Sequence, residues 1–230
     1  MIKAVRQNPL LEAPAYSLAD AASYTRVPYQ TVRYWATGRN RVPPLINLPI
    51  SEPPALSYLN LLECHILNAL RTTYSLQINS VRRALNTLAR IHSGAISKHP
   101  LLEMKFSTDG VDLFLNTTAA LVNLSQGGQT AIREILEVYL QRIEWPKTGV
   151  PKFYPFVVKH EANEPKIISI VATIAFGRSV IDGTGIATAV IASRFNARES
   201  VPALAEEYGR SPEEIEEAIR WEAKRTAAAA

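Results

Sequence analysis

Cysteine is almost absent from this chain of 230 residues, in which Cys64 stands alone. A lone cysteine forms no internal disulfide, and it excludes a cysteine-rich zinc site. Histidine is also scarce, and the four histidines do not fall at a metal-ligand spacing such as H-x-x-x-H with one another or with a carboxylate. We therefore expect no bound metal, and we expect Cys64 to be a small buried residue beside a half-exposed His65.

Long apolar runs are missing as well. None reaches the length of a membrane span, and the opening MIKAVRQNPLLEAPA lacks the apolar core of a secretory signal. These two absences predict a cytoplasmic protein without a membrane partner. The 47% of hydrophobic residues favour a globular fold, and the length suits one large domain or two to three small ones.

Positive charge is in slight excess and is spread unevenly. The net charge is +4, and Lys and Arg exceed Asp and Glu by seven in residues 1–105, whereas residues 106–158 and 159–230 carry −1 and −2. A basic N-terminal half suits a polyanion such as nucleic acid. Arginines scattered over a solvated surface would give the same composition.

Residues 16–38 have the layout of a DNA-reading helix-turn-helix. Ser17, with a carboxylate three residues on, predicts a capped first helix. A turn is expected over 24–27, and the proline that follows suits the first turn of a second helix. Val32 and Trp35, spaced at i and i+3, predict the inward face of that second helix.

The outward face of the second helix carries amide, hydroxyl, guanidinium and phenol groups, which suit contacts with base edges and phosphates. Two more arginines follow its end. The residues expected to contact DNA are Gln30, Thr31, Arg33, Tyr34, Arg39 and Arg41. Gln30 and Thr31 are the better base readers, and Arg33 and Tyr34 are the better phosphate contacts. A small helical hairpin without a DNA role gives the same apolar spacing.

The same segment resembles the N-terminal half of MerR-type regulators. There an S-[LV]-x-x-A-A opening precedes V-x-x-x-T-[VL]-R-x-W, and this chain has SLADAA followed by VPYQTVRYW. The resemblance implies that Arg33 and Tyr34 meet DNA phosphates. It ends at Pro43-Pro44, where MerR-type regulators instead carry a wing and then a long coiled-coil helix.

The spacing of the apolar residues changes several times along the middle of the chain, which indicates several helices and strands. Clustered prolines predict an irregular connector over 42–54, and Asp109-Gly110 between two apolar runs predicts a hairpin. The other expected elements, in order, are an amphipathic helix over 57–71, a helix with a basic outer face over 78–94, a turn over 126–129, a helix over 130–145, and strands over 153–158 and 166–171.

Two helices joined by a short turn are expected near the C-terminus. Ser200 and Gly209 bound a helix over 201–208. Ser211, the proline after it and Glu214 then combine an N-cap, a proline at the first helical position and a capping box. The last helix is strongly acidic, and such a face repels phosphates. We therefore expect this pair to bind protein or to dimerise rather than to read DNA.

The stretch FGRSVIDGTGI over 176–186 resembles the G-R-P-V-I-x-G-T-x-I signature of a small antitoxin domain. The segment ARESVPALAEEYGRSPEEIEEA over 197–218 resembles the segment that follows that signature. Two positions depart from the pattern, since Ser179 replaces the usual proline and Arg198 replaces the usual glycine. Neither departure removes a catalytic group.

Stand-alone copies of that domain are encoded beside PIN-like ribonuclease toxins, and residues 16–226 as a whole resemble a longer VapB-type antitoxin. The resemblance implies that residues within 166–226 bind the toxin or dimerise. Such a toxin holds Mg²⁺ on clustered carboxylates. The antitoxin would inhibit it either by placing an arginine near those carboxylates or by blocking the path of the RNA. The residues singled out for this role are Arg178, Asp182, Arg194, Arg198 and Arg225.

Nucleotide chemistry is not indicated. Gly183-Thr184-Gly185 follows an apolar strand, but the third glycine of G-x-G-x-x-G falls on Thr188 and the spacer after the strand is too long. A turn with positive φ explains these glycines better. Spacing indicates no Ser/His/Asp arrangement either, so we expect neither an enzyme nor a cofactor.

These features predict a mainly α fold with small β-hairpins, of the α+β class. The expected parts are a DNA-binding helix-turn-helix over 1–44, a helical and β-hairpin middle region over 45–158, and a helix-turn-helix-like antitoxin or dimerisation domain over 159–230. The expected function is that of a homodimeric antitoxin, which neutralises a PIN-like ribonuclease toxin and represses its own operon through operator DNA. The alternative is a stand-alone MerR-like regulator that senses a small ligand.

Overall fold

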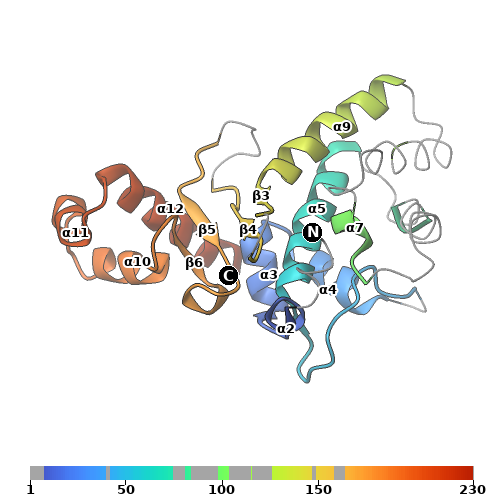
Figure 1. Cartoon of the computed structure of the whole chain (residues 1–230), viewed down its shortest axis with the longest axis horizontal. Coiled ribbons are helices and arrows are strands. Elements are labelled where there is room, and N and C mark those ends of the chain that lie inside the picture. Colours follow the sequence, from blue (N-terminus) through green and yellow to red (C-terminus); the bar gives the residue numbers. More distant parts are fainter. Residues whose placement is uncertain are drawn as a thin grey trace.

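The computed structural model describes residues 8–39, 42–74, 81–83, 98–103, 115, 126–146, 149–157 and 164–229. In this part of the chain, helices dominate and two small antiparallel sheets accompany them. The molecule is elongated, with the C-terminal helices at one end, helices α5 (Tyr58–Tyr74) and α9 (Gln126–Gln141) at the other, and the larger sheet between them (Figure 1). The predicted α+β class is confirmed.

The N-terminal helices begin where the capping residues predict. The elements in order are α2 (Pro9–Glu12), β1 (Tyr16–Ser17), α3 (Leu18–Thr25) and α4 (Tyr29–Thr37). The Ser17 hydroxyl accepts from the Asp20 backbone N–H at 3.0 Å, and the Asp20 carboxylate accepts from the Ser17 N–H, so the capping box is present. The turn is shorter than expected, because α3 continues through Thr25 and Arg26 takes a left-handed conformation (φ 58°).

An irregular connector follows α4, as the prolines predict. Residues 43–54 contain no helix or strand, and they lead into β2 (Ala55–Leu56), which pairs antiparallel with β1. The connector folds back on α4, since the N–H groups of Leu45 and Ile46 both donate to the Trp35 carbonyl.

Helix α5 lies at the centre of the N-terminal half. All of residues 58–70 are buried, so the helix is enclosed on every side. The prediction of an amphipathic helix, with one face open to solvent, is therefore wrong here. The elements packed on it include α2, α3, α7 (Pro100–Glu103) and α9. Cys64 is buried as predicted, but His65 is only 1% exposed, and its Nε2 lies 3.0 Å from the Tyr139 carbonyl oxygen of α9. That partner lies far along the chain, which is why periodicity in α5 alone misses the burial.

One buried histidine joins three segments. His99 Nδ1 lies 2.9 Å from the Glu63 carboxylate of α5, and its Nε2 lies 3.2 Å from the Glu12 carboxylate of α2. Burial raises the pKa of Glu63. Burial works to lower the pKa of His99, but the hydrogen bonds and charges of the two carboxylates outweigh it, and that pKa is raised. The imidazole of His99 therefore joins these segments through hydrogen bonds to two carboxylates.

Helix α9 begins earlier than predicted. The expected turn over 126–129 is wrong, because these residues form the first turn of α9. The helix penalty of glycine applies mainly to helix interiors, and here the two glycines stand at the N-terminal end. The inner face of α9 is formed by four buried residues, Ile132, Leu136, Tyr139 and Leu140.

A four-stranded antiparallel sheet joins the middle of the chain to its C-terminal part. Its spatial order is β3 (Ile143–Glu144), β4 (Lys152–Phe153), β5 (Ile168–Ile170) and β6 (Ser179–Ile181). Phe153 of β4 pairs with Ile170 of β5. Paired strands thus lie on either side of the expected boundary between residues 158 and 159.

Strand β4 is shorter than the strand predicted over 153–158. Pro155 has no N–H to give to a ladder, and the carbonyls beyond Phe153 are taken by a side chain instead. Arg142, only 1% exposed, donates from Nε to the Tyr154 carbonyl at 2.9 Å and from an Nη to the Pro155 carbonyl at 3.1 Å.

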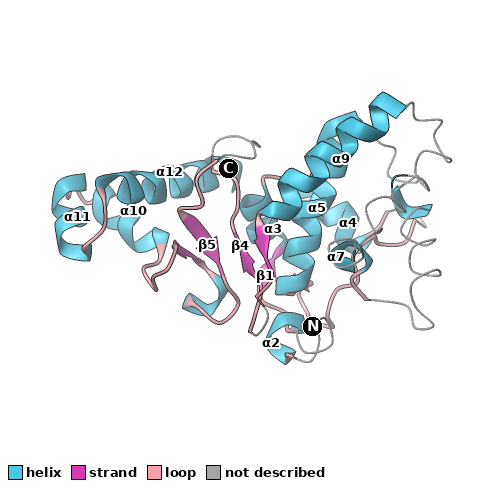
Figure 2. Cartoon of the chain, turned by 45° about the horizontal axis from the view of Figure 1, so that its top comes forward, coloured by secondary structure: helices cyan, strands magenta, loops and turns pink. Residues whose placement is uncertain are grey.

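The C-terminal part consists of the short η1 turn (Ala175–Gly177) and three helices, α10 (Thr188–Asn196), α11 (Val201–Tyr208) and α12 (Pro212–Ala229). The predicted caps are confirmed: the Ser200 hydroxyl accepts from the Ala203 N–H at 3.3 Å, and Gly209 is left-handed. Helix α12 extends from the C-terminal helices toward the sheet and packs on α3 (Figure 2).

Several predicted features lie outside the described residues. These are the hairpin at Asp109-Gly110 and most of the helix over 78–94, of which residues 81–83 are helical. Among the residues that the structure does describe, every helix is too short or too polar to cross a membrane.

Candidate nucleic-acid interface and partner surface

Helix α4 has one buried and one open face. Val32 and Trp35 are 0% and 1% exposed and hold the helix on the core, as predicted. Gln30, Arg33 and Thr37 recur on the opposite side with their side chains exposed. The helix therefore presents an amide, a guanidinium and a hydroxyl to solvent over two turns.

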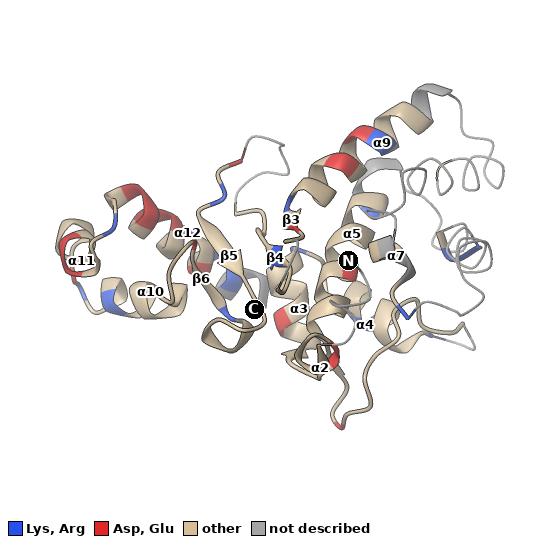
Figure 3. Ribbon diagram, in the orientation of Figure 1, with Lys and Arg blue, Asp and Glu red and all other residues tan. Residues whose placement is uncertain are grey.

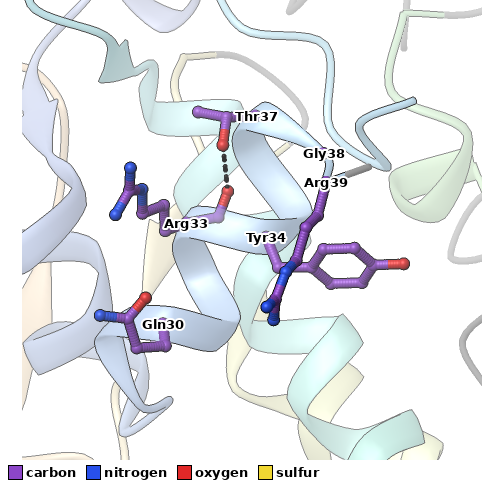
Figure 4. A pocket seen from close by; sticks show the side chains of 6 residues that line it. All are labelled: Gln30, Arg33, Tyr34, Thr37, Gly38 and Arg39. Carbon is purple, nitrogen blue, oxygen red and sulfur yellow. Dashed lines mark hydrogen bonds between the residues drawn. The ribbon is translucent and has the colours of Figure 1, made fainter. Parts of the chain in front are cut away.

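These side chains border a hollow of about 730 Å³, shown in Figure 4. The lining residues are Gln30, Arg33, Tyr34, Thr37, Gly38 and Arg39. The structure thus brings together four of the residues predicted to contact DNA. Thr37 was missed, although it lies one turn beyond Arg33 on the same face, and its hydroxyl donates to the Arg33 carbonyl at 2.9 Å.

Gly38 shapes the end of this surface. It has a φ of +71°, and a Cβ built there would lie 2.2 Å from the Val42 carbonyl oxygen. Arg39 and Val42 pair across the tight return that follows. A residue with a side chain would push this return away from α4, so the glycine keeps Arg39 beside the helix.

Thr31, a fifth predicted DNA contact, lies on another side of α4. Thr31 is half-buried and faces a smaller, mainly apolar pocket of about 170 Å³ between α4 and α5, which Tyr34 and Trp35 also line. Arg41 lies outside the described residues. Within the described residues, Arg33 and Arg39 are exposed and have no carboxylate partner, so both cations remain available to an external anion.

Two of the residues singled out in the C-terminal part are engaged by neighbours in the chain. Arg194 donates to Glu199 at 2.8 Å and also to Glu207 and the Tyr208 hydroxyl. These hydrogen bonds raise the pKa of Arg194, and the bond to Glu207 contributes most. Asp182 accepts from Lys152 Nζ of β4 at 3.0 Å. Both side chains thus have structural partners inside the molecule.

Arg225 holds the last helix on α3. Its Nε donates to the Ser23 hydroxyl at 3.2 Å, and its guanidinium carbon lies 4.5 Å from the centre of the Tyr24 ring. It also lies 3.9 Å from the Asp20 carboxylate. These contacts hold α12 against α3, and they use much of the hydrogen-bonding capacity that Arg225 could offer to another protein.

Arg178 and Arg198 remain open. Both are exposed, and neither pairs with a carboxylate in the part of the chain that the structure describes. Arg198 has a φ of 76°, in the region that favours glycine, which fits the glycine usual at this position of the resembled domain. Gly183, with a φ of 72°, forms the turn expected from the sequence.

Figure 3 shows several acidic positions along α12, but some of these carboxylates are paired within the chain. Glu217 is buried and pairs with Arg220, and Glu214 pairs with Arg210. The carboxylate of Glu222 accepts from the Thr188 hydroxyl, which lies 2.8 Å from the Ser179 hydroxyl. The serine that replaces the usual proline thus belongs to a buried polar cluster, a role that a single sequence does not signal.

Comparison with known proteins gives three findings. Residues 168–221 match a family described as a protein of unknown function, DUF433. A Mycobacterium tuberculosis protein named "Putative antitoxin VapB45" is 24% identical over 233 residues, covering 90% of this chain and 93% of that protein. The crystal structure of Rv2018 from the same organism matches with a TM-score of 0.70 and 23% identity, covering 91% of this chain and 99% of that one.

The chain is therefore similar, along nearly its whole length, to a protein named as an antitoxin. The match to Rv2018 shows a shared fold. The match over 168–221 begins at β5 and ends inside α12, so it coincides with the stretch whose sequence resembles an antitoxin domain.

Proposed function

We propose that this protein is an antitoxin whose C-terminal part binds and neutralises a PIN-like ribonuclease toxin, and whose helix-turn-helix represses its own operon. The observation that carries the proposal is the similarity, over 90% of the chain, to a protein named as an antitoxin. The open basic face of α4 supports the DNA-binding half, since a helix-turn-helix places its second helix in the major groove.

The proposed contacts with DNA follow from the geometry of α4. Gln30 is exposed on the open face and suits an adenine edge. Arg33, Tyr34 and Arg39 border the same hollow and suit phosphates. Operators read by such helices are commonly two-fold symmetric, so the proposal includes a homodimer with half-sites spaced by whole helical turns.

The proposed contacts with the toxin centre on the cations that the chain does not use itself. Arg178 and Arg198 are exposed on the C-terminal part, whereas Arg194 and Arg225 are held by neighbouring side chains. An arginine that reaches the metal-binding carboxylates of a ribonuclease would block its chemistry. We assign that role to Arg178 or Arg198, and the protein itself is proposed to have no catalytic activity.

Co-purification tests the proposal. The full chain is expressed with the product of the adjacent open reading frame, and only that product carries a tag. A stable complex, with ribonuclease activity that appears only after this chain is removed, is the expected result. Elution of the tagged product alone, with operator DNA still bound by this chain, would contradict the antitoxin half and favour a stand-alone regulator.

A ligand-sensing regulator is the second candidate, and the pocket between α4 and α5 is the observation that bears on it. At about 170 Å³ this pocket is smaller than the roughly 300 Å³ at which small-molecule sites usually begin. Thermal-shift measurements with a panel of metabolites test this candidate. If it is right, one metabolite should raise the Tm of the wild type but not that of Trp35→Phe.

A further inference from the structure

The loop between β5 and β6 carries the most exposed aromatic side chain among the described residues. Phe176 is 95% exposed, so the phenyl ring gains nothing from burial within the chain. The apolar residues Ala172, Ile174 and Ala175, which precede it in the same loop, are half-buried. A ring that stands free on an apolar base is the form of an anchor that enters a pocket on another protein.

The backbone that presents Phe176 is strained. Ala175, Phe176 and Gly177 all have positive φ, at 47°, 56° and 74°. A left-handed conformation is uncommon for any residue with a side chain, and it is an outlier for a bulky one. Two such residues in sequence persist only where the surroundings hold them, and strain of this kind clusters at binding and catalytic sites.

The surroundings do hold this loop. The Tyr16 hydroxyl of β1 donates to the Gly177 carbonyl at 2.9 Å, in a buried position. Within the loop, the Gly177 N–H donates to the Ile174 carbonyl at 2.9 Å and the Arg178 N–H to the Ala175 carbonyl at 3.1 Å. The chain thus fixes the loop from behind and leaves its tip to solvent, which is pre-organisation for binding.

The charge near the tip indicates the kind of partner. Arg178, two residues on, is exposed and has no carboxylate partner in the described part of the chain. Two acidic groups of the elements that hold this loop are already engaged, since Asp20 accepts from Ser17 and Glu222 pairs with Arg225. The tip therefore offers one phenyl ring with one cation beside it, and it lacks the several cations that a nucleic-acid backbone requires.

We propose that Phe176 is the anchor of the antitoxin–toxin interface, and that it fills an apolar pocket with an acidic rim on the toxin, which Arg178 meets. This inference rests on the proposed function and adds to it the contact that supplies most of the affinity. It also explains why a strained loop is kept: the binding of the partner repays the conformational cost.

The experiment measures the affinity of the purified product of the adjacent open reading frame for full-length variants of this chain. Phe176→Ala should weaken binding by about 30-fold or more, as expected for an interface hot spot. Ile50→Ala is the matched control, because Ile50 is equally exposed but lies in the connector. Its affinity should stay within about threefold of that of the wild type.

A second variant separates loss of binding from loss of folding. Phe176→Gly relieves the left-handed strain, so its Tm should rise by about 2–4 °C while its affinity for the partner falls with that of Phe176→Ala. Operator binding by both variants should match that of the wild type.

The outcomes are distinct. Wild-type affinity for Phe176→Ala would overturn this inference and leave the proposed function standing. If Phe176→Ala lost operator binding and kept partner binding, the loop would be assigned to DNA, and this inference would be overturned as well. Failure of the wild-type chain to bind the neighbouring product would overturn the proposed function, and this inference with it.

Discussion

The Tyr24 ring of α3 stacks on the Trp221 ring of α12, with centroids 6.0 Å apart and planes inclined by 24°. The guanidinium of Arg225 lies 4.5 Å from the centre of the Tyr24 ring, and that of Arg26 lies 5.0 Å from the centre of the Trp221 ring. Cation–π and aromatic contacts of this kind add to the free energy gained by burial. Side-chain contacts thus hold α3 and α12 together.

Trp221→Ala should remove the centre of this contact. Trp221 is fully buried, so the substitution leaves a cavity and should lower the free energy of unfolding by about 3–5 kcal/mol in urea titrations. Phe195→Ala is the control, because Phe195 is 39% exposed on α10 and should cost less than about 1 kcal/mol. Equal effects of the two variants would show that the stack does not fasten α12.

Arg33→Ala should weaken binding to operator and non-operator DNA alike. The loss of one phosphate contact should reduce the slope of log affinity against log salt by about one unit. The control is Arg220→Ala, since Arg220 pairs with Glu217 on α12, away from the α4 surface. A salt slope that is the same for Arg33→Ala and the wild type would remove Arg33 from the DNA interface.

His99 should make the stability depend on pH. Its folded-state pKa lies above the ordinary value of 6.5, so its contribution is complete below that pH and is lost as the pH rises through the folded-state pKa. The raised pKa of Glu63 acts in the same direction. The unfolding free energy of the wild type should therefore fall, relative to that of His99→Asn, as the pH rises above about 6.5.

Glu12→Gln refines this test. It removes one of the two carboxylates that raise the pKa of His99, so the loss of stability should be smaller and should be complete at a lower pH than in the wild type. Parallel pH profiles for the wild type, His99→Asn and Glu12→Gln would count against a charged His99.

Gly177→Ala should clash with Tyr16. A Cβ at this position would lie 2.4 Å from the Tyr16 hydroxyl oxygen, and the φ of +74° adds strain, so we expect a loss of more than about 2 kcal/mol. Tyr16→Phe removes the hydroxyl and its bond to the Gly177 carbonyl, and should cost about 1–3 kcal/mol.

The double variant is the decisive measurement for this pair. Because the phenylalanine lacks the atom that clashes, Gly177→Ala should cost less in the Tyr16→Phe background than in the wild type. Additive losses in urea titrations would mean that the loop does not press on Tyr16 as the structure shows.

Local signals in the sequence predict the ends of the helices well. The Ser17 capping box, the Ser200 cap and the left-handed Gly209 all depend on residues within a few positions of one another, and all are present. The α4 face follows from helical spacing in the same way, and the same rule extended by one turn finds Thr37.

Features that depend on distant partners do not follow from local patterns. The buried His65 is accommodated by a carbonyl on α9, and the Arg142 side chain ends the strand after Phe153 by taking the carbonyls that follow. Arg194 and Arg225 look like free cations in the sequence, yet their partners lie 13 and 202 residues away. A single sequence names the charges without showing which of them are already paired.

The pairing of β4 with β5 has a consequence for the lifetime of the protein in a cell. Proteases cut a folded chain mainly where it opens. With a sheet that spans the middle and C-terminal parts, and α12 packed on α3, opening of the C-terminal part disturbs the support of the N-terminal helices as well. Under the proposed function, degradation would therefore release the toxin and the operator in a single event, and the two activities would share one half-life.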